Sequence, residues 1–105
     1  MPPRARSQSP KAKNPKWVVY ILRCADGTLY TGITTDLNRR LAQHNAGTAS
    51  KYTRSRRPVT VAYRQAVKTH GDALRRELAI KKLTRTLKDT LVANYERRRA
   101  RRSSA

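Results

Sequence analysis

Two apolar runs separated by an Asp-Gly pair constrain the fold of this chain more than any other feature. Lys16–Arg23 is dense in β-branched and aromatic residues, and a second run of this kind covers Thr28–Thr34. Asp26-Gly27 lies between them, and this pair is the strongest short-range signal for a β-hairpin. The sequence therefore predicts two antiparallel strands joined by a tight turn.

The length of the hairpin loop decides where two tyrosines point. A two-residue turn would place Tyr20 and Tyr30 on opposite faces of the sheet, because successive side chains alternate. A three-residue loop with Gly27 in the left-handed conformation would place both on one face, with Gly32 opposite Tyr20. We favour the three-residue loop, since Gly32 would otherwise weaken its strand without any gain.

The rest of the chain alternates between helical and extended patterns. The sequence predicts an α+β fold in the order β-β-α-β-α-α, with a mixed or antiparallel three-stranded sheet flanked by about three helices. Three helices are expected, namely Leu37 to about Asn45 after Thr35-Asp36, Ala73–Leu83 capped by Thr69 or Asp72, and Thr84 to about Tyr95. A basic loop, Thr48–Arg57, precedes the third strand, Val59–Val67.

Positive charge is spread over the domain and both ends of the chain. Against 25 Lys and Arg the chain has 6 Asp and Glu, a net charge of +19 in 105 residues. Residues 1–15 are expected to form a disordered basic arm, 16–95 the folded domain and 96–105 a disordered basic tail. Residues 17–95 alone hold 15 basic and 5 acidic residues, a net charge of +10. Such a domain binds polyanions, so charge alone favours a ribosomal or histone-like binder without catalysis, because charge indicates affinity and not chemistry.

Several classes of protein are excluded by composition. The single Cys24 supplies neither a disulfide framework nor a multi-cysteine zinc site. No apolar run approaches the length of a membrane span, and no apolar segment follows the basic N-terminus as in a secretory signal. The cytoplasm, including the nucleoid, is the expected location.

Polar residues beside the apolar faces of the two middle helices are candidates for chemistry. Helical spacing places Arg40 and His44 beside the stripe formed by Leu37 and Leu41. In the next helix Glu77 falls on the inward-facing arc, where a carboxylate needs a partner. That partner is either Lys81, four residues on, or a divalent cation. Each residue also has a purely structural explanation, such as a snorkelling arginine or a helix-capping histidine.

Considered together, these residues resemble the GIY-YIG nuclease superfamily. Val-Val-Tyr ending at Tyr20 and Tyr-Thr-Gly ending at Gly32 correspond to its two paired motifs. Asp36–Leu41 is similar to its arginine helix, and Ala73–Glu77 to its metal-binding helix. Lys51-Tyr52-Thr53 resembles a loop of the small single-domain bacterial members, which are distant relatives of the UvrC nuclease domain. The resemblance covers residues 17 to about 90.

The resemblance implies hydrolysis of phosphodiester bonds in DNA with one Mg²⁺ or Mn²⁺ ion, in DNA repair or processing. Tyr20 would help to activate water, Tyr30 would position groups at the phosphate, and Arg40 would stabilise the developing charge. His44 would lie near the site, and Glu77 would hold the metal. The expected substrate-binding residues are Gly32, Lys51, Tyr52, Arg54, Arg56, Arg57 and Lys81.

Two further expectations concern substrate and assembly. DNA is favoured over RNA, and a monomer is expected. Several family nucleases use an asparagine downstream of the metal glutamate, and Asn94 is the next candidate in this chain. The alternative function is a nucleic-acid-binding protein that keeps the same fold with little or no catalysis.

Overall fold

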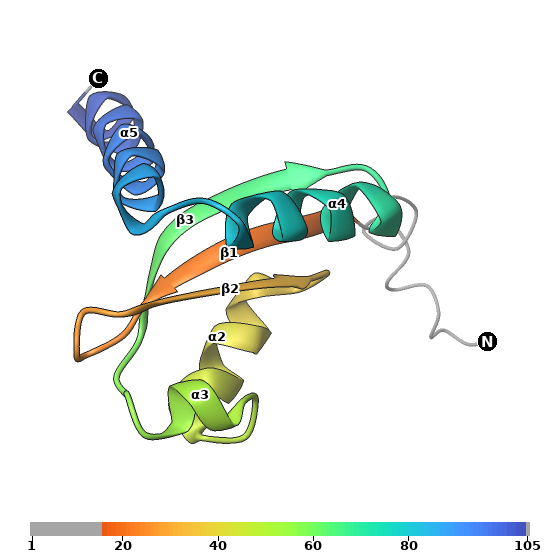
Figure 1. The fold of residues 1–105 in the computed structure, drawn as a ribbon, viewed down its shortest axis with the longest axis vertical. Coiled ribbons are helices and arrows are strands. Elements are labelled where there is room, and N and C mark those ends of the chain that lie inside the picture. Colours follow the sequence, from red (N-terminus) through yellow and green to blue (C-terminus); the bar gives the residue numbers. More distant parts are fainter. Residues whose placement is uncertain (1–15, 105) are drawn as a thin grey trace.

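The centre of the fold is a three-stranded antiparallel sheet in the order β2-β1-β3 (Figure 1). A computed structural model describes residues 16–104, so the predicted basic arm at 1–15 lies outside the described residues. The strands are β1 (Trp17–Arg23), β2 (Leu29–Thr34) and β3 (Thr60–Val67). The predicted α+β class is confirmed, and the sheet is antiparallel throughout.

The central strand β1 is covered on both faces. Val19 and Ile21 pack under α4 (His70–Lys81) and α5 (Arg85–Ser104), whereas Tyr20 and Leu22 face α2 (Leu37–Ala46). Figure 1 shows α4 on one side of the sheet, with α2 and the short α3 (Lys51–Arg54) on the other. Because side chains alternate along a strand, β1 supplies residues to both cores.

The hairpin has the register that the three-residue loop predicts. Tyr20 pairs with Gly32 and Leu22 pairs with Tyr30. Gly27 has φ +86°, and the Cys24 amide donates to the Thr28 carbonyl oxygen at 2.8 Å. Tyr20 and Tyr30 therefore lie on the same face of the sheet.

The predicted loop at 48–57 contains a short helix, so the element order is β-β-α-α-β-α-α. α3 begins after Ser50, whose hydroxyl oxygen accepts from the Thr53 amide at 3.2 Å. Because a single turn leaves no hydrophobic periodicity in the sequence, only the capping serine indicates it.

The expectation of a disordered tail at 96–105 is wrong for residues 96–104. α5 continues without a break from Arg85 to Ser104, past the predicted end at Tyr95. This segment contains no proline or glycine and is rich in arginine, a strong helix former. Within residues 16–104, no helix is long and apolar enough to cross a lipid bilayer.

The inward face of α4 differs from the one that its leucines suggest. Leu74 and Leu78 are exposed, whereas Ala73 and Ile80 are buried against the sheet. The small Ala73 side chain allows the helix backbone to approach the strands closely. The leucines lie outside this contact, and Glu77 lies at its edge.

Candidate active site

Tyr20 is a buried tyrosine whose ring lies over Gly32 on the neighbouring strand. A Cβ atom at position 32 would lie 2.6 Å from the Tyr20 hydroxyl oxygen and 2.7 Å from Cζ. The space left by the missing side chain of Gly32, one of the expected substrate-binding residues, is therefore filled by the tyrosine ring itself. This close approach gives Gly32 a structural role, because a larger residue would displace the Tyr20 ring.

A chain of hydrogen bonds leads from Tyr20 into α2 and α3. The Tyr20 hydroxyl lies 3.0 Å from His44 Nε2, and His44 Nδ1 lies 2.8 Å from Thr53 Oγ1. Tyr20, His44 and Thr53 are 2%, 1% and 0% exposed. The structure thus brings together two residues that the sequence singled out and a third, Thr53, for which the sequence suggested no role.

The contacts of Thr53 favour a proton on Nδ1 of His44. Thr53 Oγ1 donates to the Ser50 carbonyl oxygen at 3.4 Å, so it is an acceptor toward His44 Nδ1–H. Nε2 of the neutral ring is then unprotonated and accepts the Tyr20 hydroxyl proton. Burial lowers the pKa of His44, and the nearby positive charge of Arg40 lowers it further, which favours the neutral ring.

Arg40 and Glu77 both lie close enough to Tyr20 for their charges to act on it. Burial raises the pKa of Tyr20 far above its usual value, and Tyr30 raises it further. Arg40 lowers the Tyr20 pKa, while the negative charge of Glu77 raises it. Arg40 belongs to α2 and Glu77 to α4, on opposite sides of the sheet (Figure 1), so the two charges act on Tyr20 from different directions.

Glu77 is a half-buried carboxylate at the edge of α4. Its side chain is 20% exposed, and Oε2 lies 3.2 Å from Lys81 Nζ. Of the two partners considered for Glu77, Lys81 is thus the one seen in the structure. Lys81 neutralises Glu77 instead of pointing freely at a substrate.

Glu77 fits a divalent metal as its single protein ligand. Within residues 16–104, no group of three or more His, Cys, Asp or Glu side chains could hold a metal ion. Mg²⁺ accepts such a site, because it keeps several water ligands and binds one or two carboxylates together with substrate phosphates. The donor chemistry of Glu77 is therefore compatible with Mg²⁺ or Mn²⁺.

An aromatic stack extends the site toward the surface. The Tyr30 ring lies 5.1 Å from the His44 ring and 5.8 Å from the Tyr52 ring, measured between centroids. The Arg56 guanidinium lies over the Tyr52 ring, 4.0 Å from its centroid. Tyr52 is thus held by two side chains while it stays exposed at the surface.

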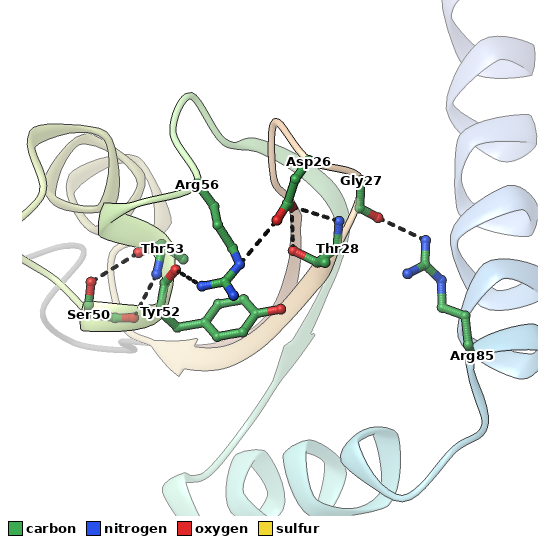
Figure 2. Close-up of polar contacts among 8 residues, drawn as sticks. All are labelled: Asp26, Gly27, Thr28, Ser50, Tyr52, Thr53, Arg56 and Arg85. Carbon is green, nitrogen blue, oxygen red and sulfur yellow. Dashed lines mark hydrogen bonds and ion pairs between the residues drawn. The ribbon is translucent and has the colours of Figure 1, made fainter.

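Arg56 also ties the stack to the tip of the hairpin (Figure 2). Its Nε donates to Asp26 at 3.2 Å, and its NH1 donates to the Tyr52 carbonyl oxygen at 2.8 Å. Asp26 accepts from the Thr28 hydroxyl and amide as well, and these bonds lower the Asp26 pKa, with a further contribution from Arg56. Arg56 is therefore a structural residue of this loop.

The remaining basic loop residues do not converge on the tyrosines. Arg57 donates to the carbonyl oxygens of Arg54 and Asn45. Arg54 and Arg57 line a separate hollow of about 510 Å³, and Lys51 is exposed. Asn94 bonds to Arg97 on α5.

The antiparallel sheet is covered on both faces and carries a buried tyrosine, with an arginine helix on one side and a helix-borne glutamate on the other. Together these features define a nuclease-like fold. The GIY-YIG catalytic domain matches residues 16–90, and the chain belongs to the GIY-YIG family. The family's catalytic domains act on nucleic acids in general and typically use a divalent metal.

Relatives of similar size support this assignment. The UPF0213 protein DP2720 of Desulfotalea psychrophila is 50% identical over 86% of this chain and 83% of its own length. The UPF0213 protein VNG_2274C of Halobacterium salinarum is 51% identical over 70% of this chain and 95% of its own. The solution structure of the protein EF2693 from E. faecalis, 38% identical, covers 77% of this chain and 86% of that chain, with a TM-score of 0.54.

Proposed function

We propose that this protein is a divalent-metal-dependent endonuclease that hydrolyses phosphodiester bonds in DNA. The observation that carries the proposal is the buried Tyr20–His44–Thr53 hydrogen-bond chain, with Arg40 and Glu77 close enough for their charges to act on Tyr20. A tyrosine held in this way has a defined route for its proton, which a merely structural tyrosine does not need.

Tyr20 acts as a proton relay, because its raised pKa excludes a free phenolate near neutral pH. As the oxygen of a water molecule attacks phosphorus, a proton of that water passes to the Tyr20 oxygen. The Tyr20 hydroxyl proton passes at the same time to His44 Nε2. The bond from phosphorus to the leaving oxygen breaks, and that oxygen takes a proton from solvent water on its own side of the phosphate. The lowered pKa of His44 then favours loss of its extra proton through Tyr20 to solvent, which restores the starting state.

Arg40 stabilises the negative charge that develops on the phosphate oxygens, because a guanidinium pairs with phosphate through a planar fork. Glu77 would hold the divalent ion, which when bound supplies positive charge at the scissile phosphate. For this, Lys81 would have to break its ion pair with Glu77. The Lys81 ammonium group would then be available to contact a phosphate oxygen.

The test is a cleavage assay on duplex, branched and single-stranded DNA and on matched RNA, with Mg²⁺, Mn²⁺ or EDTA. Wild type is expected to cut DNA only with a metal. Tyr20→Phe and Glu77→Gln are expected to bind DNA as wild type does and to lose cutting. Cleavage that survives Glu77→Gln unchanged would show that the mechanism is wrong.

A second candidate, nucleic-acid binding without catalysis, is favoured by one observation. Glu77 is neutralised by Lys81 in the same helix, as in an ordinary structural ion pair. Wild type that binds DNA in the assay above without cutting any substrate would support this candidate.

A further inference from the structure

A second cluster of positive charge lies between α5 and β3, outside the tyrosine site. A groove of about 390 Å³ is lined by Arg64 and Ala66 of β3 together with Tyr95, Arg98 and Arg99 of α5. An adjoining hollow of about 370 Å³ shares Arg64, Tyr95 and Arg99 and continues onto α2. We refer to the two together as the arginine groove. Figure 1 shows the two elements that form it, at the edge of the sheet opposite β2.

The three arginines of the groove have no acidic partner within the described part of the chain. The ion pairs among residues 16–104 involve other basic side chains, and no Asp or Glu lines either hollow. The Arg99 guanidinium lies 5.8 Å from the Tyr95 ring centroid, and Tyr95 is itself fixed by the Tyr63 ring at 5.5 Å. Three guanidinium groups beside one groove repel one another unless an anion lies between them.

The arginine groove begins on the strand next to Tyr20. Arg64 is the β3 partner of Tyr20, and Gly32 is its β2 partner. Directly opposite residues of antiparallel strands point to the same face, so Arg64 lies on the face that carries the tyrosine. Leu37 and Leu41 of α2 pack with the Tyr20 core and also line the groove.

We propose that the arginine groove binds the sugar–phosphate backbone of the DNA substrate beside the bond that is cut. This rests on the proposed function, because Arg64 and the α2 part of the groove lie on the face of the sheet that carries Tyr20, whereas α5 packs on the other face. Guanidinium groups match phosphate through two parallel hydrogen bonds, and spaced arginines follow a chain of phosphates better than a single anion. The groove thus supplies affinity that does not depend on base sequence.

The test compares two variants with the same loss of charge. The groove variant carries Arg64→Gln, Arg98→Gln and Arg99→Gln. The control carries Lys16→Gln, Lys68→Gln and Lys82→Gln, three exposed positions that line neither hollow. Equilibrium binding to a labelled DNA duplex is measured by fluorescence anisotropy in EDTA over a series of salt concentrations, and cleavage is measured separately with Mg²⁺.

The groove variant is expected to bind roughly tenfold or more weakly than the control, with a salt slope smaller by about 0.9 for each phosphate that the protein no longer neutralises. Arg64→Lys, which keeps the charge but not the fork, is expected to lie between wild type and the groove variant. Circular dichroism verifies that each variant is folded.

Equal affinity and equal salt slope for the groove variant and the control would overturn the proposal, as would tighter binding of a matched RNA duplex through the same arginines. The outcome for the proposed function is separate. If the groove variant loses DNA binding but wild type cuts nothing, the arginine groove stands and the nuclease mechanism fails. If wild type cuts and the groove variant binds normally, the nuclease mechanism stands and the proposal for the arginine groove fails.

Discussion

The proposed proton relay through Tyr20 and His44 depends on Thr53, whose hydroxyl oxygen lies 2.8 Å from His44 Nδ1. Thr53→Val removes the acceptor of His44 Nδ1–H, so Nε2 is no longer fixed as the acceptor of the Tyr20 proton. We expect kcat to fall by roughly tenfold or more with DNA affinity unchanged, and Thr53→Ser to restore it. Imidazole ¹⁵N NMR should show an unprotonated Nε2 in wild type and a mixture of tautomers in Thr53→Val. Wild-type spectra with the proton on Nε2 would contradict the assignment, whatever the activity.

Position 32 requires glycine, because the Tyr20 ring lies directly over it. In Gly32→Ala the new methyl group would lie 2.6 Å from the Tyr20 hydroxyl oxygen. We expect the free energy of unfolding to fall by about 1–3 kcal/mol, measured by urea denaturation, together with loss of cleavage. Gly71→Ala is the matched control, because its methyl group would meet only the Arg75 guanidinium at 3.6 Å in a helix. The control is expected to gain roughly 0.5–1 kcal/mol. Equal stability of the two variants would contradict this explanation.

His44 should make stability depend on pH. Its pKa is lowered in the folded state, chiefly by burial, so below about pH 6.5 the unfolded chain takes up a proton that the folded chain does not. The stability that neutral His44 contributes is therefore fully present above this pH, and the free energy of unfolding falls as the pH decreases below it. Urea denaturation from about pH 7.5 to 5 measures the slope. His44→Gln should remove it and His70→Gln should keep it, whereas an unchanged slope in His44→Gln would assign it to another group.

The one-turn helix α3 places Thr53 in the core. Ser50→Ala removes the cap that accepts the Thr53 amide hydrogen, and a lost cap costs about 1 kcal/mol. We expect this loss in urea denaturation, with a reduced kcat because Thr53 is less firmly placed. Ser55→Ala, which keeps the backbone bond at the other end of α3, serves as the control and should change little. A Ser50→Ala variant as stable as Ser55→Ala would show that α3 is held by its packing alone.

The sequence predicted the hairpin and the inward face of α2 but not the orientation of α4. The Asp26-Gly27 signal and Gly32 determined the register of Tyr20 and Tyr30, because turn chemistry is local. The orientation of α4 could not be predicted in the same way. Its leucines favoured one face, but the close approach of Ala73 to the sheet selects another, and such an approach is a property of the assembled fold. Thr53 was missed for a related reason, since its partner His44 lies on a different helix.

In the long helix α5, the residues that pack into the core and the residues that carry positive charge lie in different parts of the helix. Val92 is buried and Leu91 and Tyr95 pack beside it, whereas five arginines between residues 97 and 102 follow the last of these core residues. Deleting residues 97–105 should change the unfolding free energy by less than about 1 kcal/mol, because few buried groups are removed. Thermal and urea unfolding measure this. Loss of cooperative unfolding would show that the end of α5 supports the fold.

The tip of the β1–β2 hairpin has a consequence for engineering. An exposed hairpin tip is normally a good place to insert a tag or a fluorescent label. Here Asp26 receives the Arg56 guanidinium from the loop after α3, while the Gly27 carbonyl oxygen accepts from Arg85 of α5 at 2.9 Å (Figure 2). An insertion between these two residues would release two distant segments at once. The hairpin tip therefore holds two distant segments in place and is a poor site for inserting a tag or a label.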